Sequence, residues 1–420
     1  MPRNHDLPRA FLTLPEEGER TSSALEKKVR LIALKELLTL SAAGLGPRAE
    51  ASWSKVQSVV RRCLKEQSSG VLSAVGSPDV LPGLLSMASS QRPPSVVLPG
   101  LVPALLASLH GAGFTPDEAI LWEHPYSGFA HPGAGWVDVS GGARSMLLDA
   151  AGLAVESSNG SRTDVGASWV GPDLSASRAP TAVGRESLGV HFSLVDSNPL
   201  SMDEAHPDKS GNEVTLGEKT HDEWVSSLNQ AMDLIGQALP EWYAELVTTT
   251  HRLVPVGYEP EMHLSASYRE APGLVYLTLH PDPLTMAEAI IHETQHGKLN
   301  RLSWLDPVLN NAYTAWSESP VRPDLRPVMG VLLAVHAFVP VAALHERLES
   351  AGHPLAKTHR FQERRAEVLA GNAGGLDIVE RMGEATPLGQ RVIDDLRRLH
   401  DHLVRGADTS RWAASALPPG

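Results

Sequence analysis

The first hundred residues alternate apolar and polar positions with the period of a helix. In SALEKKVRLIALKELLTL (23–40) and SWSKVQSVVRRCLKEQ (52–67), apolar residues recur at spacings of three and four, which is typical of amphipathic helices. LPGLLSMASS and LPGLVPALLASLHGAG continue the pattern after short proline-bearing breaks. The pattern predicts a helical N-terminal region over residues 1–112.

Residues 113–215 have a different texture. Gly, Ser, Asp and Pro become frequent, and the apolar runs are short, as in AILWEH, GWVDV and LGVHFSLVD. Such runs between turn-forming residues are typical of strands joined by loops. We therefore predict a mixed strand and loop region, in which the polar segment 157–184 is an exposed loop.

Helical periodicity returns at His221 and dominates residues 216–420. Two strands, MHLSASYRE and GLVYLTLH, interrupt it around Ala271-Pro272-Gly273. A helix carrying a histidine motif follows, then a long apolar helix over about 327–350, charged helices to about 406 and a loose tail, WAASALPPG. The predicted fold class is α+β, mainly α-helical, with a helical region at each end and a small β-containing region between them.

Composition narrows the possible partners. The 420 residues carry a formal net charge of −13, whereas nucleic-acid binding needs a basic surface. The single cysteine, Cys63, excludes an internal disulfide, and the first residues lack an apolar stretch of signal-peptide length. The longest apolar run, VMGVLLAVHAFVPVAAL, is short for a bilayer span. We expect a cytoplasmic protein that binds neither nucleic acid nor membrane.

The stretch AEAIIHETQHGKLNRL contains an HExxH motif formed by His292, Glu293 and His296. Residues four apart lie on the same face of a helix, so both imidazoles can reach one metal ion. Thr285 and Glu288 have the spacing of a capping box, which predicts that the helix begins at Thr285. The motif favours a metal site over the alternative of a surface helix with two solvated histidines.

Catalytic metals usually take three protein ligands, so a third is needed. The metzincin extension would require Gly at 299 and His at 302, but Leu299 and Leu302 occupy these positions. A later glutamate is a second option, and Glu318 and Glu346 are the candidates.

His336 is the stronger candidate, because it is a lone polar residue inside an apolar helix. Taken alone it is typical of a satisfied core histidine, but an HExxH helix upstream needs a partner. Pro340 should kink this helix, since it cannot donate a backbone hydrogen bond. His345, nine residues further on, is the weaker candidate.

Arg322 and Arg326 lie beside prolines on the segment between the two helices. The planar fork of arginine suits bidentate binding of a carboxylate. The alternative is a pair of solvated arginines, one of them paired with Asp324.

Together, HLSASYREAPGLVYLTLHPDPLTMAEAIIHETQHGKLNRL and SPVRPDLRPVMGVLLAVHAF resemble the bacterial HExxH-domain peptide-modification proteins, also described as α-ketoglutarate-dependent, HExxH-type peptide β-hydroxylases. The resemblance is sharp over about 260–345, looser over 195–260 and faint before that. It implies a dioxygenase that uses Fe(II), α-ketoglutarate and O2 to hydroxylate a side chain of a ribosomally synthesised precursor peptide.

The resemblance also implies roles for individual residues. His292, His296 and His336 would be iron ligands, and Arg322 or Arg326 would bind the far carboxylate of α-ketoglutarate. Glu293 would support the site or contact the substrate, although a carboxylate such as Glu293 could instead complete the ligand set. The alternatives are a zinc metallopeptidase with Glu293 as general base, and a non-catalytic peptide-binding protein.

Overall fold

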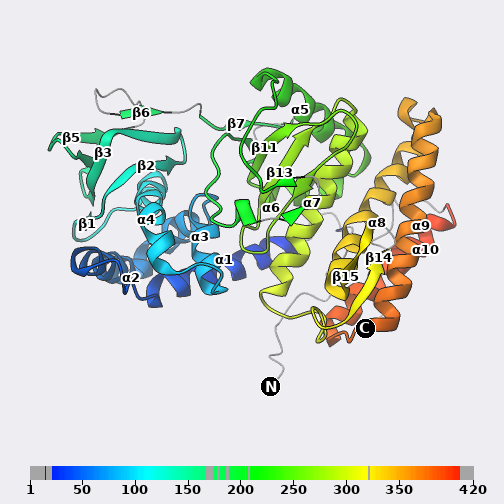
Figure 1. Cartoon of the computed structure of the whole chain (residues 1–420), viewed down its shortest axis with the longest axis horizontal. Helices are drawn as coiled ribbons and strands as arrows, with labels where there is room; N and C mark the ends of the chain where they lie inside the picture. Colours follow the sequence, from blue (N-terminus) through cyan, green and yellow to red (C-terminus); the bar gives the residue numbers. More distant parts are fainter. Residues whose placement is uncertain are drawn as a thin grey trace.

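The computed structural model describes Pro15 and residues 21–166, 174–176, 179–185, 189–203, 205–206, 209–319 and 322–406. It confirms the predicted α+β class, with 54% helix and 18% strand, a helical N-terminal part, central sheets and a helical C-terminal region (Figure 1). The tail predicted to be loose, 412–420, lies outside the described residues.

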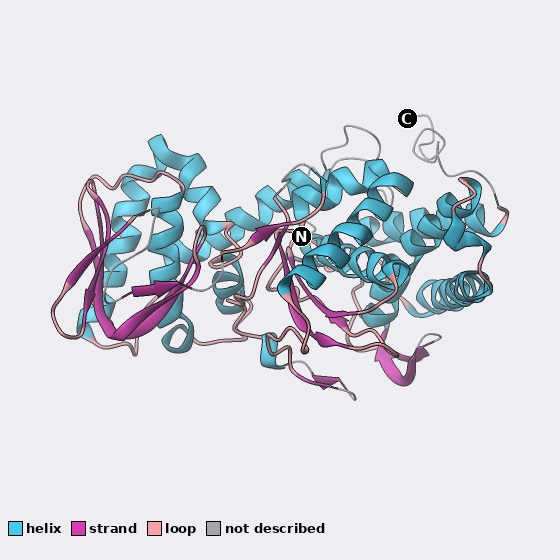
Figure 2. Cartoon of the chain, turned by 90° about the horizontal axis from the view of Figure 1, so that it is seen from above, coloured by secondary structure: helices cyan, strands magenta, loops and turns pink. Residues whose placement is uncertain are grey.

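The N-terminal half packs helices on one face of an antiparallel sheet (Figure 2). The helices are α1 (Thr21–Thr39), α2 (Pro47–Val75), α3 (Leu81–Ala88) and α4 (Pro94–Gly111). The strands are β1 (Ile120–Trp122), β2 (Tyr126–His131), β3 (Gly135–Asp149), β4 (Gly152–Ser157), β5 (Arg162–Val165) and β6 (Leu174–Ala176). The long strand β3 pairs with β1, β2, β4 and β6. Helices and sheet share one core, which includes Trp53, Leu105, Trp122 and Phe129.

The segment 157–184, predicted as a loop, contains strands β5, β6 and β7 (Thr181–Ala182). The loop prediction is wrong for these residues. β5 pairs with the strongly patterned β4 and β6 with β3, so neighbouring strands impose the extended conformation on polar residues that have little tendency of their own.

The C-terminal half contains a second sheet, which has both parallel and antiparallel strand pairs. Its order is β12-β13-β11-β8-β7, with β8 (His191–Phe192), β11 (Arg252–Tyr258), β12 (Ser265–Ala266) and β13 (Leu274–Leu279). β11 is parallel to both neighbours, whereas β12 runs antiparallel to β13 at one edge. All six residues of β13 are buried, as expected for a strand covered on both faces. The short η2 (Ser201–Asp203), β9 (Ala205–His206) and β10 (Lys209–Ser210) precede α5 (His221–Ala238) and α6 (Pro240–Thr249).

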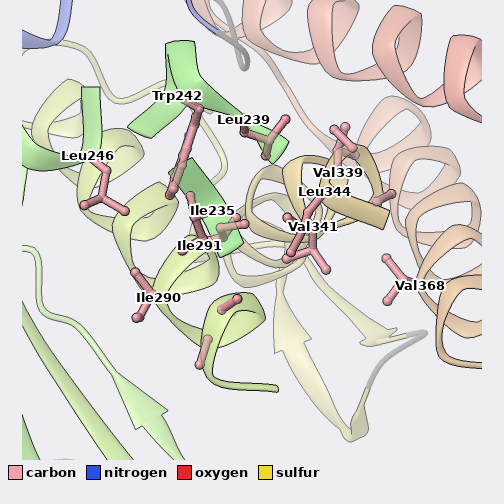
Figure 3. Close-up of a cluster of buried hydrophobic side chains, with 14 of the residues drawn as sticks. Ile235, Leu239, Trp242, Leu246, Ile290, Ile291, Val339, Val341, Leu344 and Val368 are labelled. Carbon is pink, nitrogen blue, oxygen red and sulfur yellow. The ribbon is translucent and has the colours of Figure 1, made fainter. Parts of the chain in front are cut away.

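The remaining elements build the helical end of the molecule. They are α7 (Pro283–Ser303), the hairpin β14 (Trp316–Ser319) and β15 (Arg322–Pro327), α8 (Val328–Ser350), η3 (Pro354–Lys357), α9 (His359–Met382) and α10 (Pro387–Val404). Figure 3 shows part of their core, a cluster that contains Ile290 and Ile291 of α7, Trp242 of α6 and Leu344 of α8. Each fully buried aliphatic side chain of this kind contributes about 1.5–3 kcal/mol, so α7 is firmly held.

Helix α7 begins two residues earlier than the capping box predicted. Asp282 is the N-cap and its carboxylate accepts a hydrogen bond from the backbone N–H of Leu284 at 2.9 Å. Pro283 occupies the first helical position, where its missing N–H costs nothing. The prediction that Thr285 and Glu288 form the cap is therefore wrong, and Glu288 is buried inside the protein.

Helices α4 and α8 are long and apolar enough to cross a membrane, by length and composition alone. In the folded chain, 61% of the most apolar 18-residue stretch of α4 is buried, and 78% of that of α8. Such burial is typical of core helices. α8 continues through Pro340 as one helix from Val328 to Ser350.

Candidate metal centre

Three side chains of α7 form a group that can hold a metal ion. One ligand atom from each of His292, Glu293 and His296 lies within 4.8 Å of the others. The two imidazole centroids are 4.2 Å apart, with an angle of 74° between the rings. The spacing of the motif on a regular helix explains this convergence, because residues one turn apart project from the same face. The predicted pairing of the two histidines is present in the structure.

Glu293 is held in place by the edge strand of the second sheet. Its two carboxylate oxygens accept hydrogen bonds from the Ser265 and Ser267 hydroxyls, each at 2.6 Å. One of these oxygens lies 4.0 Å from Nε2 of His292. Ser265 lies in β12 and Ser267 directly follows it, and because each hydroxyl holds one oxygen, the carboxylate is fixed before any ligand arrives.

The group forms one wall of a cleft of about 470 Å³. The cleft lies between α7, the edge segment 263–267, the N-terminal part of α8 and single residues from β15 and α9. Phe338 of α8 packs edge-on against His292, with ring centroids 4.6 Å apart. A small molecule or an extended side chain therefore has room beside the two imidazoles.

Burial keeps both imidazoles uncharged. It lowers the pKa of His292 well below the usual value, and the nearby His296, His263 and Arg364 add to the effect. Burial also lowers the pKa of His296, although Glu293 opposes this. A neutral imidazole is the form that binds a metal.

The residues present fit a metal ion. Nδ1 of His292 and Nδ1 of His296 are buried without a hydrogen-bond partner among the described residues. Buried polar atoms of this kind are rare in folded proteins, and here they lie in a cluster of two imidazoles and a carboxylate. Two histidines with one carboxylate form a donor set that occurs in catalytic zinc sites and in non-haem Fe(II) sites.

His336 lies beside this group but is not one of its three members. It is fully buried in α8 and interacts with the backbone of Gln295. Burial lowers the pKa of His336 well below its usual value, with contributions from Lys298 and His296. His336 is also not among the residues lining the cleft. Its assignment as third ligand stays a prediction, and the carboxylate that the structure brings to the histidines is that of Glu293.

The other candidate ligands lie elsewhere. Glu318 is exposed on β14, whereas Glu346 is buried and accepts a hydrogen bond from Ser350 at 2.7 Å. His345 is fully buried, and its Nε2 lies 2.7 Å from a carboxylate oxygen of Glu288. None of the three belongs to the metal-capable group.

Only one of the two predicted arginines can be placed at the cleft. Arg326 lines it, and its Nε lies 2.9 Å from the Asp324 carboxylate, so the ion pair considered from the sequence is present. Arg322 lies at the start of β15, but its side chain is outside the described part of the chain. The β14–β15 hairpin that carries both residues was not predicted from the sequence.

Sequence analysis missed two charged residues of the cleft, Glu288 and Arg364. Nε of Arg364 donates to Glu288 at 2.9 Å, while the other oxygen of Glu288 meets His345. These interactions hold the pKa of Glu288 below its usual value, although burial by itself would raise it. The available signal was that Glu288 precedes His292 by one helical turn and shares its face.

The fold and the site together define an α+β protein with a His-Glu-x-x-His group that can hold a metal ion. Comparison with models of known protein families and with curated proteins finds no match.

Proposed function

We propose that this protein is an Fe(II)- and α-ketoglutarate-dependent hydroxylase that acts on a side chain of a ribosomally made peptide. One observation carries the proposal: two imidazoles and a carboxylate converge within 4.8 Å at the wall of a cleft that also holds arginines. Two histidines with one carboxylate are the usual ligands of non-haem iron oxygenases, and arginine is the residue best suited to a ligand carboxylate. The sequence resemblance over residues 260–345 points the same way.

In this proposal His292, His296 and Glu293 hold the iron, and Ser265 and Ser267 orient Glu293 through its two carboxylate oxygens. When bound, the iron with α-ketoglutarate and O2 supplies the oxidation: the keto acid gives succinate and CO2, and one oxygen atom is inserted into a C–H bond of the peptide. Phe338 and Leu333 line the same cleft and limit the access of water.

The edge strand β12 supports a peptide as the substrate. The register pairs Ser265 with Leu277, and the backbone N–H of Thr278 donates to Leu264 at 2.9 Å. Because hydrogen-bonded and outward-facing residues alternate in an antiparallel pair, the backbone N–H and C=O of Ser265 face away from β13. Among the described strands none pairs with this side of β12. Such an open edge can bind an extended peptide as an added strand, directly beside the metal group.

The test uses protein purified without oxygen and then given Fe(II), α-ketoglutarate and O2, with and without the peptide encoded beside its gene. We expect succinate to form and the peptide to gain about 16 Da, one oxygen atom. The double variant H292A/H296A is the control and should form neither product. Peptide cleavage with zinc alone would instead support the metallopeptidase, with Glu293 as general base. Peptide binding without turnover under either condition would support the non-catalytic alternative.

A further inference from the structure

Arg364 brings a positive charge into the metal cleft from a helix far from the motif in sequence. It lies on α9 and lines the cleft together with His292 and His296. Its Nε donates to Glu288 at 2.9 Å, and Glu288 precedes His292 by one turn on α7. Arg364 is therefore anchored to the metal helix itself.

Phe338 links Arg364 to the metal group. The guanidinium carbon of Arg364 lies 5.7 Å from the centroid of the Phe338 ring, and this ring lies 4.6 Å from that of His292. Arg364 is also close enough to His292 to contribute to the low pKa of that imidazole. The cation and the metal ligands thus flank one aromatic side chain within the same cleft.

The guanidinium of Arg364 is held in a fixed orientation by a hydrogen bond from its Nε to Glu288. Glu288 is clamped between Nε2 of His345 at 2.7 Å and Nε of Arg364. Another carboxylate, that of Glu367, lies 3.7 Å from Nη1 of Arg364, but its side chain is 69% exposed, so solvent weakens this contact. Since arginine offers five N–H donors in a rigid fork, its terminal nitrogens can still bind a carboxylate ligand.

Arg326 offers a less suitable cation. It lies on the β14–β15 hairpin, and its Nε lies 2.9 Å from the carboxylate of Asp324, two residues away on the same strand. The side chain of Asp324 is 49% exposed, whereas that of Glu288, the partner of Arg364, is only 9% exposed and belongs to the metal helix, so Arg364 is the more firmly held of the two arginines.

We propose that Arg364 binds the far carboxylate of the keto acid, the one that does not chelate the metal. This inference rests on the proposed function and assigns one of its binding residues. The carbon chain of a five-carbon keto diacid is about 5 Å long, and a metal bond of about 2 Å at one end and a hydrogen bond of about 3 Å at the other extend its reach. This total is comparable with the two steps of 4.6 and 5.7 Å from His292 to Phe338 and from Phe338 to Arg364. In the metallopeptidase alternative, the same residue would bind the C-terminal carboxylate of a peptide.

The experiment measures equilibrium binding to Fe(II)-loaded protein without oxygen, by calorimetry, so turnover is not needed. The ligands are α-ketoglutarate and 2-oxopentanoate, which has the same length and chelating end but lacks the far carboxylate. We expect R364Q to weaken α-ketoglutarate roughly 10- to 100-fold, the effect of losing a charged hydrogen-bonded contact, and to leave 2-oxopentanoate unchanged. R364K keeps the charge without the fork and should lie between R364Q and the wild type.

Two arginines provide the comparison. Arg360, one turn earlier on α9, lies in a neighbouring cavity and pairs with Asp282 at 3.6 Å, so R360Q should bind both acids as the wild type does. If R326Q loses α-ketoglutarate and R364Q does not, the inference is overturned while the proposed function stands. Wild-type protein that binds neither acid contradicts the proposed function itself. A zinc-loaded protein that binds only peptides with a free C-terminus, in an Arg364-dependent way, overturns the assignment to a keto acid.

Discussion

Glu293 is the side chain on which the chemistry of the cleft depends. Two serine hydroxyls fix its carboxylate, and the two imidazoles beside it are neutral because of burial. A fixed anion next to two neutral donors is suited to a dipositive ion, since the ion meets its ligands without rearranging them.

Replacing Glu293 and His336 separately distinguishes two ligand sets. We expect E293A to bind Fe(II) or Zn(II) at least about 10-fold more weakly, because a ligand is lost. H336A should retain the metal, since His336 is outside the group and outside the cleft lining, but it should unfold more easily by about 2–4 kcal/mol because it leaves a cavity. Competition with a coloured chelator measures the affinity, and urea unfolding measures the stability.

The opposite result would restore the ligand set predicted from sequence. If H336A loses the metal while circular dichroism shows it folded, His336 is a ligand and the carboxylate of Glu293 is not sufficient.

At the scale of single residues, the sequence predicted those features of the site that depend on one helix alone. The spacing of His292 and His296 fixes their convergence wherever the helix lies. It could not predict Ser265, Ser267 or Arg364 as their neighbours, because these meet α7 only through the packing of β12 and α9. Nothing local distinguishes Arg364 from the adjacent Arg365, whose charge lies 3.3 Å from Glu349 instead.

Among the elements, Glu288 is the point where three helices meet. It belongs to α7 and binds His345 of α8 and Arg364 of α9 through its two oxygens. With side chains at 9% exposure for Glu288 and 0% for His345, the contact lies within the protein. The same carboxylate therefore joins His345 to Arg364 and orients the guanidinium of Arg364.

Replacing Glu288 should make the free energy of unfolding depend less on pH under acidic conditions. The pKa of Glu288 is lowered in the folded state, so its stabilisation is present above the unfolded carboxyl value of about 4.3 and is lost as pH falls through the folded pKa. E288Q should lower the free energy of unfolding by about 2 kcal/mol at pH 7. The difference in this free energy between E288Q and the wild type should become smaller below about pH 4. Urea unfolding of metal-free protein across pH 3–7 measures this. A gap of constant size would show that the charge of Glu288 contributes nothing.

Long periodic elements were predictable and short ones were not. The four N-terminal helices, the histidine-bearing helices and strand β13 were confirmed. The hairpin β14–β15 was missed, because its sequence is rich in proline and its strands pair only with each other among the described strands. Strand β11, at the end of a segment with helical periodicity, is set by its parallel neighbours β8 and β13.

Across the whole molecule, buried charges join the two halves. Glu26 of α1 binds Arg301 of α7 and lies 3.2 Å from Nε2 of His251. Asp79, between α2 and α3, forms a bidentate pair with Arg252 of β11 at 2.6 and 3.0 Å. All four charged side chains are almost inaccessible to solvent. The N-terminal half is thus fastened to the helix that carries the metal ligands.

E26Q should therefore destabilise the whole protein. It leaves the Arg301 guanidinium buried without its counter-charge, which costs about 3–5 kcal/mol. Burial alone would raise the pKa of Glu26, but Arg301, His251 and Arg30 hold it far below the usual range. The difference in the free energy of unfolding between E26Q and the wild type should therefore be largest above about pH 5 and become smaller as the pH falls further.

R397Q is the matched control, because Arg397 pairs with the partly exposed Asp377 and Glu380 on the surface. It should change the free energy of unfolding by less than about 1 kcal/mol. Equal losses in E26Q and R397Q would mean that the buried pair contributes no more than a surface one.

A ribosome makes Glu26 long before Arg301, since 275 positions separate them. While the chain grows, the carboxylate on α1 must stay hydrated, because its permanent counter-ion does not yet exist. The N-terminal layers can assemble early with the later turns of α1 in their core, but the Glu26 end of α1 can dock only after the metal-bearing helix has emerged. Shortened chains that stop before Arg301 should therefore leave the Glu26 surface of α1 exposed and bind chaperones. In chains that end after Arg301, α7 should cover this surface.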